Sequence, residues 1–197
     1  RRLAIRSLAL QPEDRVLDLC AGTADLSIAA ARAGAGRVVG IDIAGAMLRV
    51  GLQKVAHGNL QGRVTLVRGD ATQIPVADGA MTASTIAFGI RNVNDPARAC
   101  EEIHRALAPG GRLAILEFAV PTLPVVRALY LWYFKRVLPL IGAVISRHDS
   151  AYGYLPASVS AFQTPSEFAA LLQRSGFSDV RARSLTLGIV ILYTARK

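Results

Sequence analysis

Three aspartates stand at or near the ends of three short apolar runs in the first 70 residues. Asp18 and Asp42 lie in the first two runs, and Asp70 follows the third. Apolar runs of this length, separated by helical intervals, predict buried parallel strands whose carboxyl ends meet at one edge of a sheet. A carboxylate there can accept hydrogen bonds from a ribose diol or an exocyclic amine. The three aspartates therefore predict one site for a nucleoside-bearing ligand.

The loop after the first run, residues 20–25, reads Cys-Ala-Gly-Thr-Ala-Asp and contains a single glycine. A dinucleotide loop has the pattern G-x-G-x-x-G, which lets its backbone approach a pyrophosphate. Asp18 and Asp25 would repel a pyrophosphate, whereas they suit the ammonium and sulfonium groups of S-adenosylmethionine. The loop therefore favours S-adenosylmethionine over NAD. In the structural alternative, Asp18 and Asp42 only cap the ends of strands.

The length and composition indicate a single domain. The 197 residues, 52% of them hydrophobic, suffice for a sizeable core. Cys20 and Cys100 fall in an apolar strand and a helix, which indicates reduced thiols in a cytoplasmic protein. The three histidines have no metal-ligand spacing, so we expect no metal. The chain opens on Arg1 without a start methionine or an apolar signal, and we expect a segment to precede it.

The net charge of +9 is unevenly distributed. Up to Val120 there are 14 Lys and Arg against 11 Asp and Glu, and from Pro121 onward there are 9 against 3. A basic segment can contact nucleic acid or an anionic membrane, and its simplest interpretation is a solvated face. Residues 88–93 lack the Asn/Asp-Pro-Pro-aromatic run of enzymes that methylate nucleobase amines. We therefore expect no nucleic-acid partner.

Strands and helices alternate along most of the chain, which is typical of an α/β fold. The last two strands should form an antiparallel pair at a sheet edge, and a turn is expected at 109–111. The strands are expected at 16–20, 38–41, 63–68, 80–87, 112–118, 178–184 and 188–194. The helices are expected at 3–10, 26–32, 44–57, 96–107 and 164–176.

The segment from Leu123 to Ile145 is the most apolar of the chain, but it carries Arg127, Lys135, Arg136 and Pro139. These residues argue against a membrane span. The pattern predicts an amphipathic helix, broken or kinked at Pro139, that covers the sheet and the ligand cleft. Its aromatic residues can form core or a substrate entrance. Residues 146–160 are irregular.

With these residues placed, the chain resembles the ubiquinone/menaquinone biosynthesis C-methyltransferases, a family that includes the demethylmenaquinone methyltransferases. The general motifs of class I S-adenosylmethionine enzymes are V-L-D-L-C-A-G-T-A-D at 16–25, G-I-D at 40–42, G-D-A at 69–71 and L-A-P-G-G-R-L at 107–113. The narrower motifs are A-F-G-I-R-N-V at 87–93, L-E-F at 116–118, L-P-L-I-G at 138–142 and Y-G-Y-L-P-A-S-V at 152–159.

The resemblance implies a class I methyltransferase (Rossmann-like) fold, an α/β three-layer sandwich with a mostly parallel seven-stranded sheet and an antiparallel edge. We expect one domain over residues 1–197, with 121–160 as a substrate-side insertion. The expected cofactor-binding residues are Asp18, Gly22, Thr23, Asp42, Ile43, Asp70, Ala71 and Ala87. Many relatives carry Gly at position 24 and Ser at position 87, where this chain has alanine.

The implied reaction is methyl transfer from S-adenosylmethionine to a ring carbon of a polyprenylated quinol. The phenolic pKa lies near ~10, so a base or a cation must help. Arg91 can stabilise the phenolate, Asn92 can orient a quinol oxygen, and His148, Asp149 and Tyr154 are further candidates for proton transfer. A salt bridge to a nearby carboxylate is the structural alternative for Arg91.

Three other functions remain open: methylation of another small phenol or amine, a non-catalytic cofactor-binding subunit, and an NAD-dependent oxidoreductase. Because a polyprenyl tail partitions into lipid, we expect a cytoplasmic protein that binds the inner face of an anionic membrane through 123–145. The sequence does not fix the quinol ring, the prenyl length or the oligomeric state.

Overall fold

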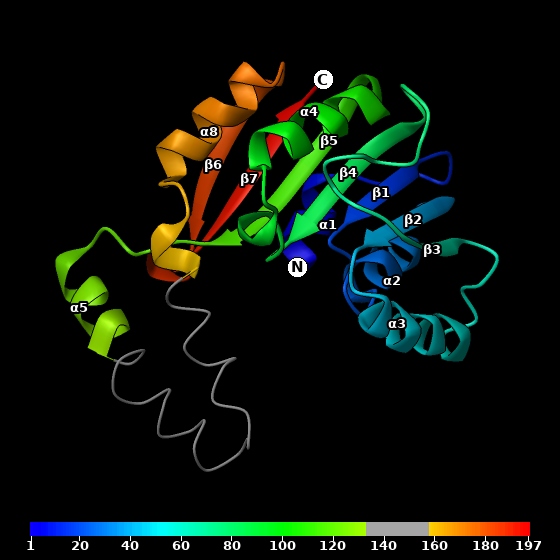
Figure 1. Cartoon of the computed structure of the whole chain (residues 1–197), viewed down its shortest axis with the longest axis horizontal. Coiled ribbons are helices and arrows are strands. Elements are labelled where there is room, and N and C mark those ends of the chain that lie inside the picture. Colours follow the sequence, from blue (N-terminus) through cyan, green and yellow to red (C-terminus); the bar gives the residue numbers. More distant parts are fainter. Residues whose placement is uncertain (133–157) are drawn as a thin grey trace, which may run out of the picture.

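The computed structural model of the chain describes residues 1–132 and 158–197. Seven strands form one sheet in the order β3-β2-β1-β4-β5-β7-β6 (Figure 1). The strands are β1 (Arg15–Leu19), β2 (Arg37–Asp42), β3 (Val64–Arg68), β4 (Met81–Ala87), β5 (Leu107–Phe118), β6 (Ser178–Leu185) and β7 (Val190–Arg196). The helices are α1 (Arg2–Ser7), α2 (Asp25–Arg32), α3 (Gly45–His57), η1 (Ile90–Asn92), α4 (Pro96–Ala106), α5 (Pro124–Trp132), α8 (Pro165–Arg174) and η3 (Thr186–Gly188).

Strands β1 to β5 run parallel to one another, and β7 runs antiparallel to both β5 and β6. The predicted fold class is confirmed, including the antiparallel pair at one edge. In this topology the chain reverses its direction along the sheet after β3 and returns to pair β4 with β1. The carboxyl ends of β1, β2 and β4 therefore meet at a crevice, where ligands bind in open α/β sheets.

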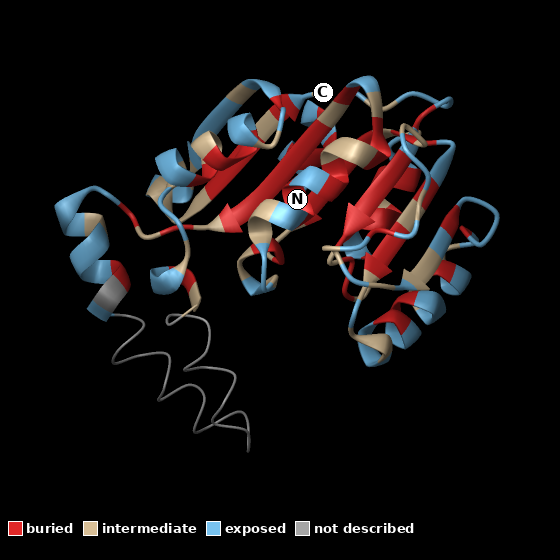
Figure 2. Ribbon diagram, turned by 45° about the horizontal axis from the view of Figure 1, so that its top comes forward, coloured by how far each residue is buried: buried red, intermediate tan, exposed pale blue. Residues whose placement is uncertain are grey.

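The sheet is the buried middle layer of the sandwich (Figure 2). One face packs against α4 and α8, through side chains such as Ile103 and Phe168. The other face packs against α1, α2 and α3, through side chains such as Ile5 and Val55. The central strands therefore have both faces covered, which explains why they appear in the sequence as continuous apolar runs.

Two helices begin where the sequence predicts. The hydroxyl of Thr164 accepts the amide of Glu167 at 3.4 Å, and the Glu167 carboxylate accepts the amide of Thr164 at 2.8 Å, which completes a capping box before α8. Asp95 caps α4 by accepting the amide of Arg98 at 2.9 Å. These caps fix the ends of two helices that pack on the sheet.

Strand β5 differs from the prediction, because it begins at Leu107 rather than Arg112 and includes the expected turn at 109–111. Leu107 pairs with Met81, and the register then shifts before Arg112 pairs with Ala83 on one side and with Arg196 on the other. The amide of Gly110 donates to the carbonyl of Lys197 at 3.0 Å. Lys197 thus extends the hydrogen bonding between β5 and β7 to residues 109–111, where the sequence predicted only a turn.

The described part of the apolar segment is α5, which stands to one side of the sheet in both views (Figures 1 and 2). The sequence suggested a helix that covers the sheet, but α5 does not cover it. The chain leaves β5 beside η3, where Pro121 lies against Gly188. The remainder, including Pro139, lies outside the described residues. In the two described ranges, no helix combines the length and the apolar character that crossing a membrane requires.

Candidate functional site

A cavity of about 490 Å³ opens at the carboxyl ends of β1, β2 and β4. All eight residues expected to bind the cofactor line it, and so does Asn92. They come from four separate places in the chain: β1 with the loop that follows it, the end of β2, the turn after β3, and the end of β4. The topology therefore brings together the residues that the sequence placed at successive strand ends.

Asp42 connects two walls of this cavity. One carboxylate oxygen accepts the amide of Gly22 at 2.8 Å, and the other accepts the amide of Ala44 at 2.7 Å. A carboxylate has about four lone-pair sites, so each oxygen can accept a further hydrogen bond. Asp42 is therefore placed both to hold the loop and to accept two hydroxyls of a ribose.

Asp18 lies deeper, on β1, and only 1% of its surface is exposed. Its carboxylate accepts the hydroxyl of Ser27 at 2.5 Å. Burial raises the pKa of Asp18 to about 7, and the charge of Asp42 adds to the rise while the bonds from Ser27 oppose it. A cation in the cavity would favour the ionised form of this group.

Asp70 follows β3 and is exposed. One of its oxygens accepts both the amide and the hydroxyl of Thr72 at 2.8 Å, and these bonds lower the pKa of the carboxyl. Asp70 therefore stabilises a local turn. Its other oxygen makes no hydrogen bond within the part of the chain that the structure describes, and can accept an amine.

The β1–α2 loop has an unusual backbone. Cys20, Gly22 and Ala24 have φ angles of 54°, 56° and 62°. Ala24 adopts this left-handed conformation, which glycine would tolerate at lower cost. The loop is also tied to α3, because Lys54 donates to the hydroxyl of Thr23 at 2.8 Å and to the carboxylate of Asp25 at 2.7 Å.

Asp25 is paired with two basic residues, so it would repel a pyrophosphate less than the sequence suggested. Its carboxylate forms salt bridges with Lys54 and, at 3.2 Å, with Arg1, so the charge of this acid is compensated. Asp18 and Asp42 have no salt bridge among the described residues. The preference of the cavity for a cationic ligand therefore depends on Asp18 and Asp42, and not on Asp25.

Arg91 and Asn92 follow β4 but have different surroundings. Asn92 lines the cavity, whereas Arg91 does not. The guanidinium of Arg91 is 2.7 Å from the carboxylate of Glu117, with 7% and 0% of the two side chains exposed. The salt bridge that was the structural alternative for Arg91 is therefore present. Its role in catalysis stays a prediction.

Several residues at the site were not anticipated. Phe88 and Met47 line the cavity, and Glu117 holds Arg91 behind it. Phe88 belongs to the motif A-F-G-I-R-N-V, but the sequence predicted no role for it. A side chain at Gly89 would place its Cβ 2.3 Å from that of Cys20, so only glycine permits the loops to approach this closely. His148, Asp149 and Tyr154 lie outside the described residues.

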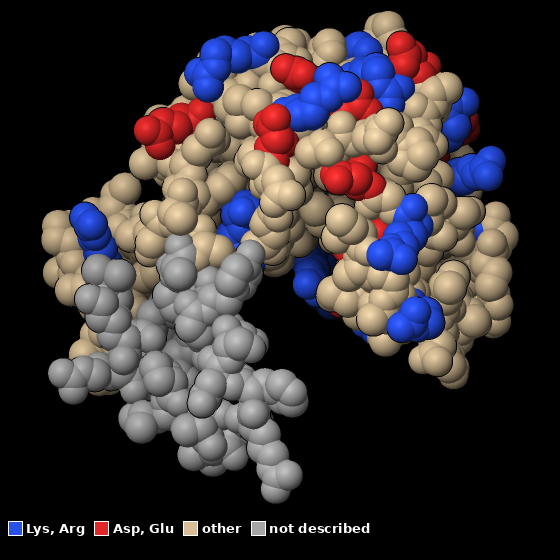
Figure 3. Space-filling view, viewed as in Figure 1, with Lys and Arg blue, Asp and Glu red and all other residues tan. Residues whose placement is uncertain are grey.

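Basic and acidic side chains are interspersed around α4 on the face seen in Figure 3. Arg98 pairs with Glu101 at 3.1 Å, and Arg105 pairs with Asp78 at 2.6 Å. On this face, the basic side chains over α4 therefore do not form a continuous positive patch. Among residues 1–132 and 158–197, no three His, Cys, Asp or Glu side chains are grouped as metal ligands.

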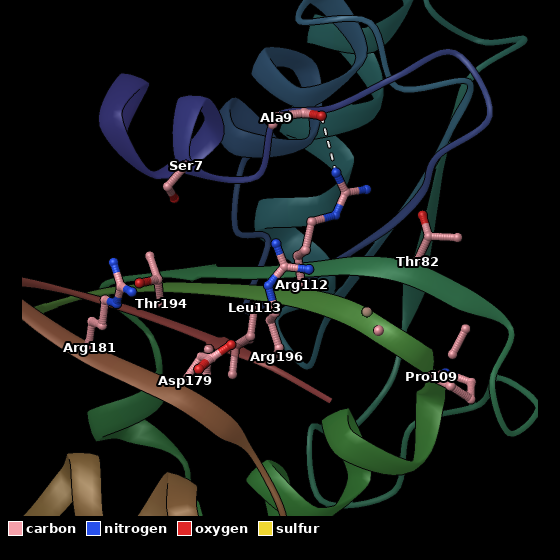
Figure 4. Close-up of a pocket in the computed structure, with 14 residues that line it drawn as sticks. Ser7, Ala9, Thr82, Pro109, Arg112, Leu113, Asp179, Arg181, Thr194 and Arg196 are labelled. Carbon is pink, nitrogen blue, oxygen red and sulfur yellow. Dashed lines mark hydrogen bonds between the residues drawn. The ribbon is translucent and has the colours of Figure 1, made fainter.

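A second cavity, of about 610 Å³, lies at the opposite end of β5 (Figure 4). Arg112, Arg181 and Arg196 line it from three adjacent strands. Arg112 donates to the carbonyl of Ala9 at 3.1 Å and forms a salt bridge with Asp14. None of the site residues predicted from the sequence lines this cavity, so we assign no role in the reaction to it.

The donor and acceptor groups of the first cavity fit S-adenosylmethionine. Asp42 can accept the ribose hydroxyls, Asp70 can accept the adenine amine, and Asp18 favours a nearby cation. The volume lies within the range of roughly 300–1,000 Å³ that is usual for small-molecule sites. The ribose, the adenine amine and the cationic groups of the methyl donor therefore each have a matching partner.

Known proteins agree with this assignment. The profile of the ubiE/COQ5 methyltransferase family matches residues 1–197. The chain is 42% identical over 199 residues to a ubiquinone/menaquinone biosynthesis C-methyltransferase of Geotalea daltonii, covering 100% of this chain and 84% of that protein. It is 41% identical over 197 residues to a demethylmenaquinone methyltransferase of Mycolicibacterium vanbaalenii, covering 100% and 82%.

The fold is shared with solved structures. A putative methyltransferase of Bacillus halodurans aligns with a TM-score of 0.72 at 18% identity, over 99% of this chain and 97% of that one. A SAM-dependent methyltransferase of Aquifex aeolicus aligns with a TM-score of 0.69 at 18% identity, over 98% and 87%. The chain belongs to the ubiE/COQ5 methyltransferase family, and its methyl donor is S-adenosylmethionine.

Proposed function

We propose that this enzyme transfers the methyl group of S-adenosylmethionine to a ring carbon of a polyprenylated quinol, in menaquinone or ubiquinone biosynthesis. The proposal draws its substrate class from relatives that carry this function in their names and that match the chain along its length. The observation that carries it is the cavity in which Asp18, Asp42 and Asp70 lie together with Asn92.

The acids would hold the cofactor from three sides. Asp42 would accept the ribose hydroxyls, Asp70 and the amide of Ala71 would bind the adenine edge, and Asp18 would balance the positive charge of the methionine end. Gly22, Thr23, Ile43 and Ala87 would complete the wall around it. Bound in this way, the cofactor supplies an electrophilic methyl group on a sulfonium.

The protein's own contribution would be positioning and charge stabilisation. Holding two reactants in line can recover about 7–11 kcal/mol of the barrier. Asn92 would orient a quinol oxygen, and Arg91 would stabilise the negative charge that develops when the quinol loses its proton. His148 and Tyr154 remain candidates for the base that accepts this proton.

The substrate's prenyl tail requires contact with lipid, and α5 supports such contact. Val125, Leu129 and Trp132 are 82%, 63% and 57% exposed and recur at the spacing of one helix face. Arg127 on the same helix is also exposed. We propose that this stripe inserts into the interface of an anionic membrane while Arg127 stays near the headgroups.

The test is a methyl-transfer assay with a panel of naphthoquinols and benzoquinols, each with and without a prenyl tail. Transfer that requires a prenylated quinol would support the proposal and identify the ring. Transfer to simple phenols or amines, but to no quinol, would favour the other methyltransferase function. Cofactor binding without any transfer would favour a non-catalytic subunit.

A further inference from the structure

The ion pair between Arg91 and Glu117 lies behind the cavity and is part of a larger set of hydrogen bonds. One Glu117 oxygen accepts the guanidinium of Arg91 at 2.7 Å and the amide of Phe118 at 2.8 Å. The other accepts the backbone amide of Arg91 at 3.3 Å. Glu117 therefore binds both the side chain and the backbone of Arg91.

Arg91 in turn holds the loop that forms one wall of the cavity. Its guanidinium donates to the carbonyl of Phe88 at 2.6 Å. Phe88 has a φ of 63°, a left-handed conformation that a bulky residue adopts only when its surroundings enforce it. The Phe88 ring stacks on Phe118, with centroids 4.4 Å apart, next to Glu117 in the sequence.

The same guanidinium also contacts the chain returning from the apolar segment. Its Nε donates to the hydroxyl of Ser158 at 3.3 Å. Arg91 thus connects β5, the β4–η1 loop and the region before α8. Each of these bonds depends on the guanidinium keeping one orientation, and among the described residues Glu117 is its one carboxylate partner.

We propose that Glu117 is a positioning residue, which fixes Arg91 and through it holds Phe88, Gly89 and Asn92 in the shape that methyl transfer requires. The proposal rests on the proposed function for its catalytic consequence. Glu117 does not line the cavity, so its effect would pass through Arg91 and the loop. A buried carboxylate destabilises the folded protein unless it is paired, so Glu117 and Arg91 depend on each other.

Cys20 offers a readout that does not depend on activity. Gly89 packs against it so closely that a Cβ on this glycine would lie 2.9 Å from the Cys20 sulfur. Burial raises the pKa of the Cys20 thiol to about 12, so the thiol reacts slowly while the loop is closed. Cys100, a fully buried residue of α4, serves as an internal reference in the same molecule.

The experiment compares the wild type with Glu117→Gln, which keeps the size of the side chain and removes its charge. We expect a thiol reagent to label Cys20 roughly ten- to a hundredfold faster in the variant, with Cys100 unchanged, because the loop is released. Quinol turnover should fall while S-adenosylhomocysteine binding changes much less. Glu117→Asp, which retains the charge, should restore part of both properties.

Asp14→Asn is the matched control, because it breaks a partly buried pair with Arg112 at the far end of the sheet. It should leave the labelling of Cys20 unchanged. Variants that unfold would label Cys20 and Cys100 together, so faster labelling of Cys20 alone supports the proposal. Equal labelling of Cys20 in the wild type and Glu117→Gln overturns it.

A double-mutant cycle separates action through Arg91 from any direct effect. Glu117→Gln should lower turnover strongly when Arg91 is present and little further in an Arg91→Lys background. Equal losses in both backgrounds would overturn the proposed route through Arg91. If the wild type methylates no quinol, the proposed function fails, whereas the labelling experiment still decides whether Glu117 holds the loop.

Discussion

The carboxylate of Asp42 accepts the amide of Gly22 at 2.8 Å, which joins the end of β2 to the loop after β1. This bond reaches the loop's single glycine, whose φ is 56°. The second oxygen of Asp42 accepts the amide of Ala44 at the start of α3. One carboxylate therefore organises the two loops between which the ribose of the cofactor would lie.

Replacing Asp42 by alanine should weaken cofactor binding strongly. Each charge-assisted hydrogen bond that is lost costs about 1.5–3 kcal/mol, so affinity should fall at least about tenfold. Isothermal titration with S-adenosylhomocysteine measures this change. Asp179→Ala, at an exposed acid of β6, is the control and should bind normally. Unchanged affinity in Asp42→Ala would reduce Asp42 to a structural role.

Asp18 should make stability depend on pH in a characteristic direction. Its pKa is about 7 in the folded protein, against roughly 3.9 in an unfolded chain. Between these values the folded state keeps a proton that the unfolded state has lost. The free energy of unfolding should therefore fall as pH rises from about 4 to about 7, by up to about 1.4 kcal/mol per pH unit.

Asp18→Asn removes this titration and provides the comparison. Urea unfolding of both proteins between pH 4 and 8 should show the wild type losing stability relative to the variant as pH rises. A constant difference across that range would mean that Asp18 ionises normally. In the wild type alone, S-adenosylmethionine should bind more tightly as pH passes about 7, because its cationic groups favour ionised Asp18.

Arg91→Ala should lower turnover much more than cofactor affinity. Removing one group that stabilises a developing negative charge costs about 10²–10³ in rate, by analogy with oxyanion donors. The variant should also be less stable by about 3–5 kcal/mol, since Glu117 is left buried without its partner. Turnover is measured at a temperature where the variant is folded. Normal turnover with a quinol would exclude the proposed role.

The exposed stripe of α5 should carry vesicle binding. Replacing Leu129 and Trp132 by serine removes two apolar side chains, each worth about 1.5–3 kcal/mol when fully buried. Co-sedimentation with anionic vesicles should decrease, and raising the salt should weaken binding of the wild type.

Leu52→Ser is the control for this experiment, because Leu52 is 52% exposed on α3, away from α5. Its binding should match that of the wild type. Equal sedimentation of the α5 variant and the wild type would show that the stripe does not contact lipid.

The strand ends could be predicted from sequence because local patterns encode them. Asp42 and Asp70 each end or follow an apolar run, and right-handed crossovers bring such ends to one edge. The cavity lining followed from this rule and from the family motifs. The start of β5 could not be predicted in this way, because its pairing with Lys197 depends on the other end of the chain.

For Arg91 the sequence suggested a salt bridge but did not identify its partner. Glu117 lies 26 residues further along, and nothing local in L-E-F indicates which side of β5 it faces or what it pairs with. The Phe88 ring stacks on Phe118 of β5, and the adjacent Gly89 packs against Cys20 in the loop after β1. Tertiary packing of this kind overrides local preference.

The position of the transferred methyl group distinguishes C-methylation of a quinol from the other reactions. The enzyme is incubated with isotopically labelled S-adenosylmethionine and a prenylated quinol, and the product is characterised by mass spectrometry and NMR. The account predicts one labelled methyl on a ring carbon for each S-adenosylhomocysteine released, and loss of this product in Asp42→Ala. A labelled methyl on a quinol oxygen, or no methylated quinol while the cofactor binds, would contradict it.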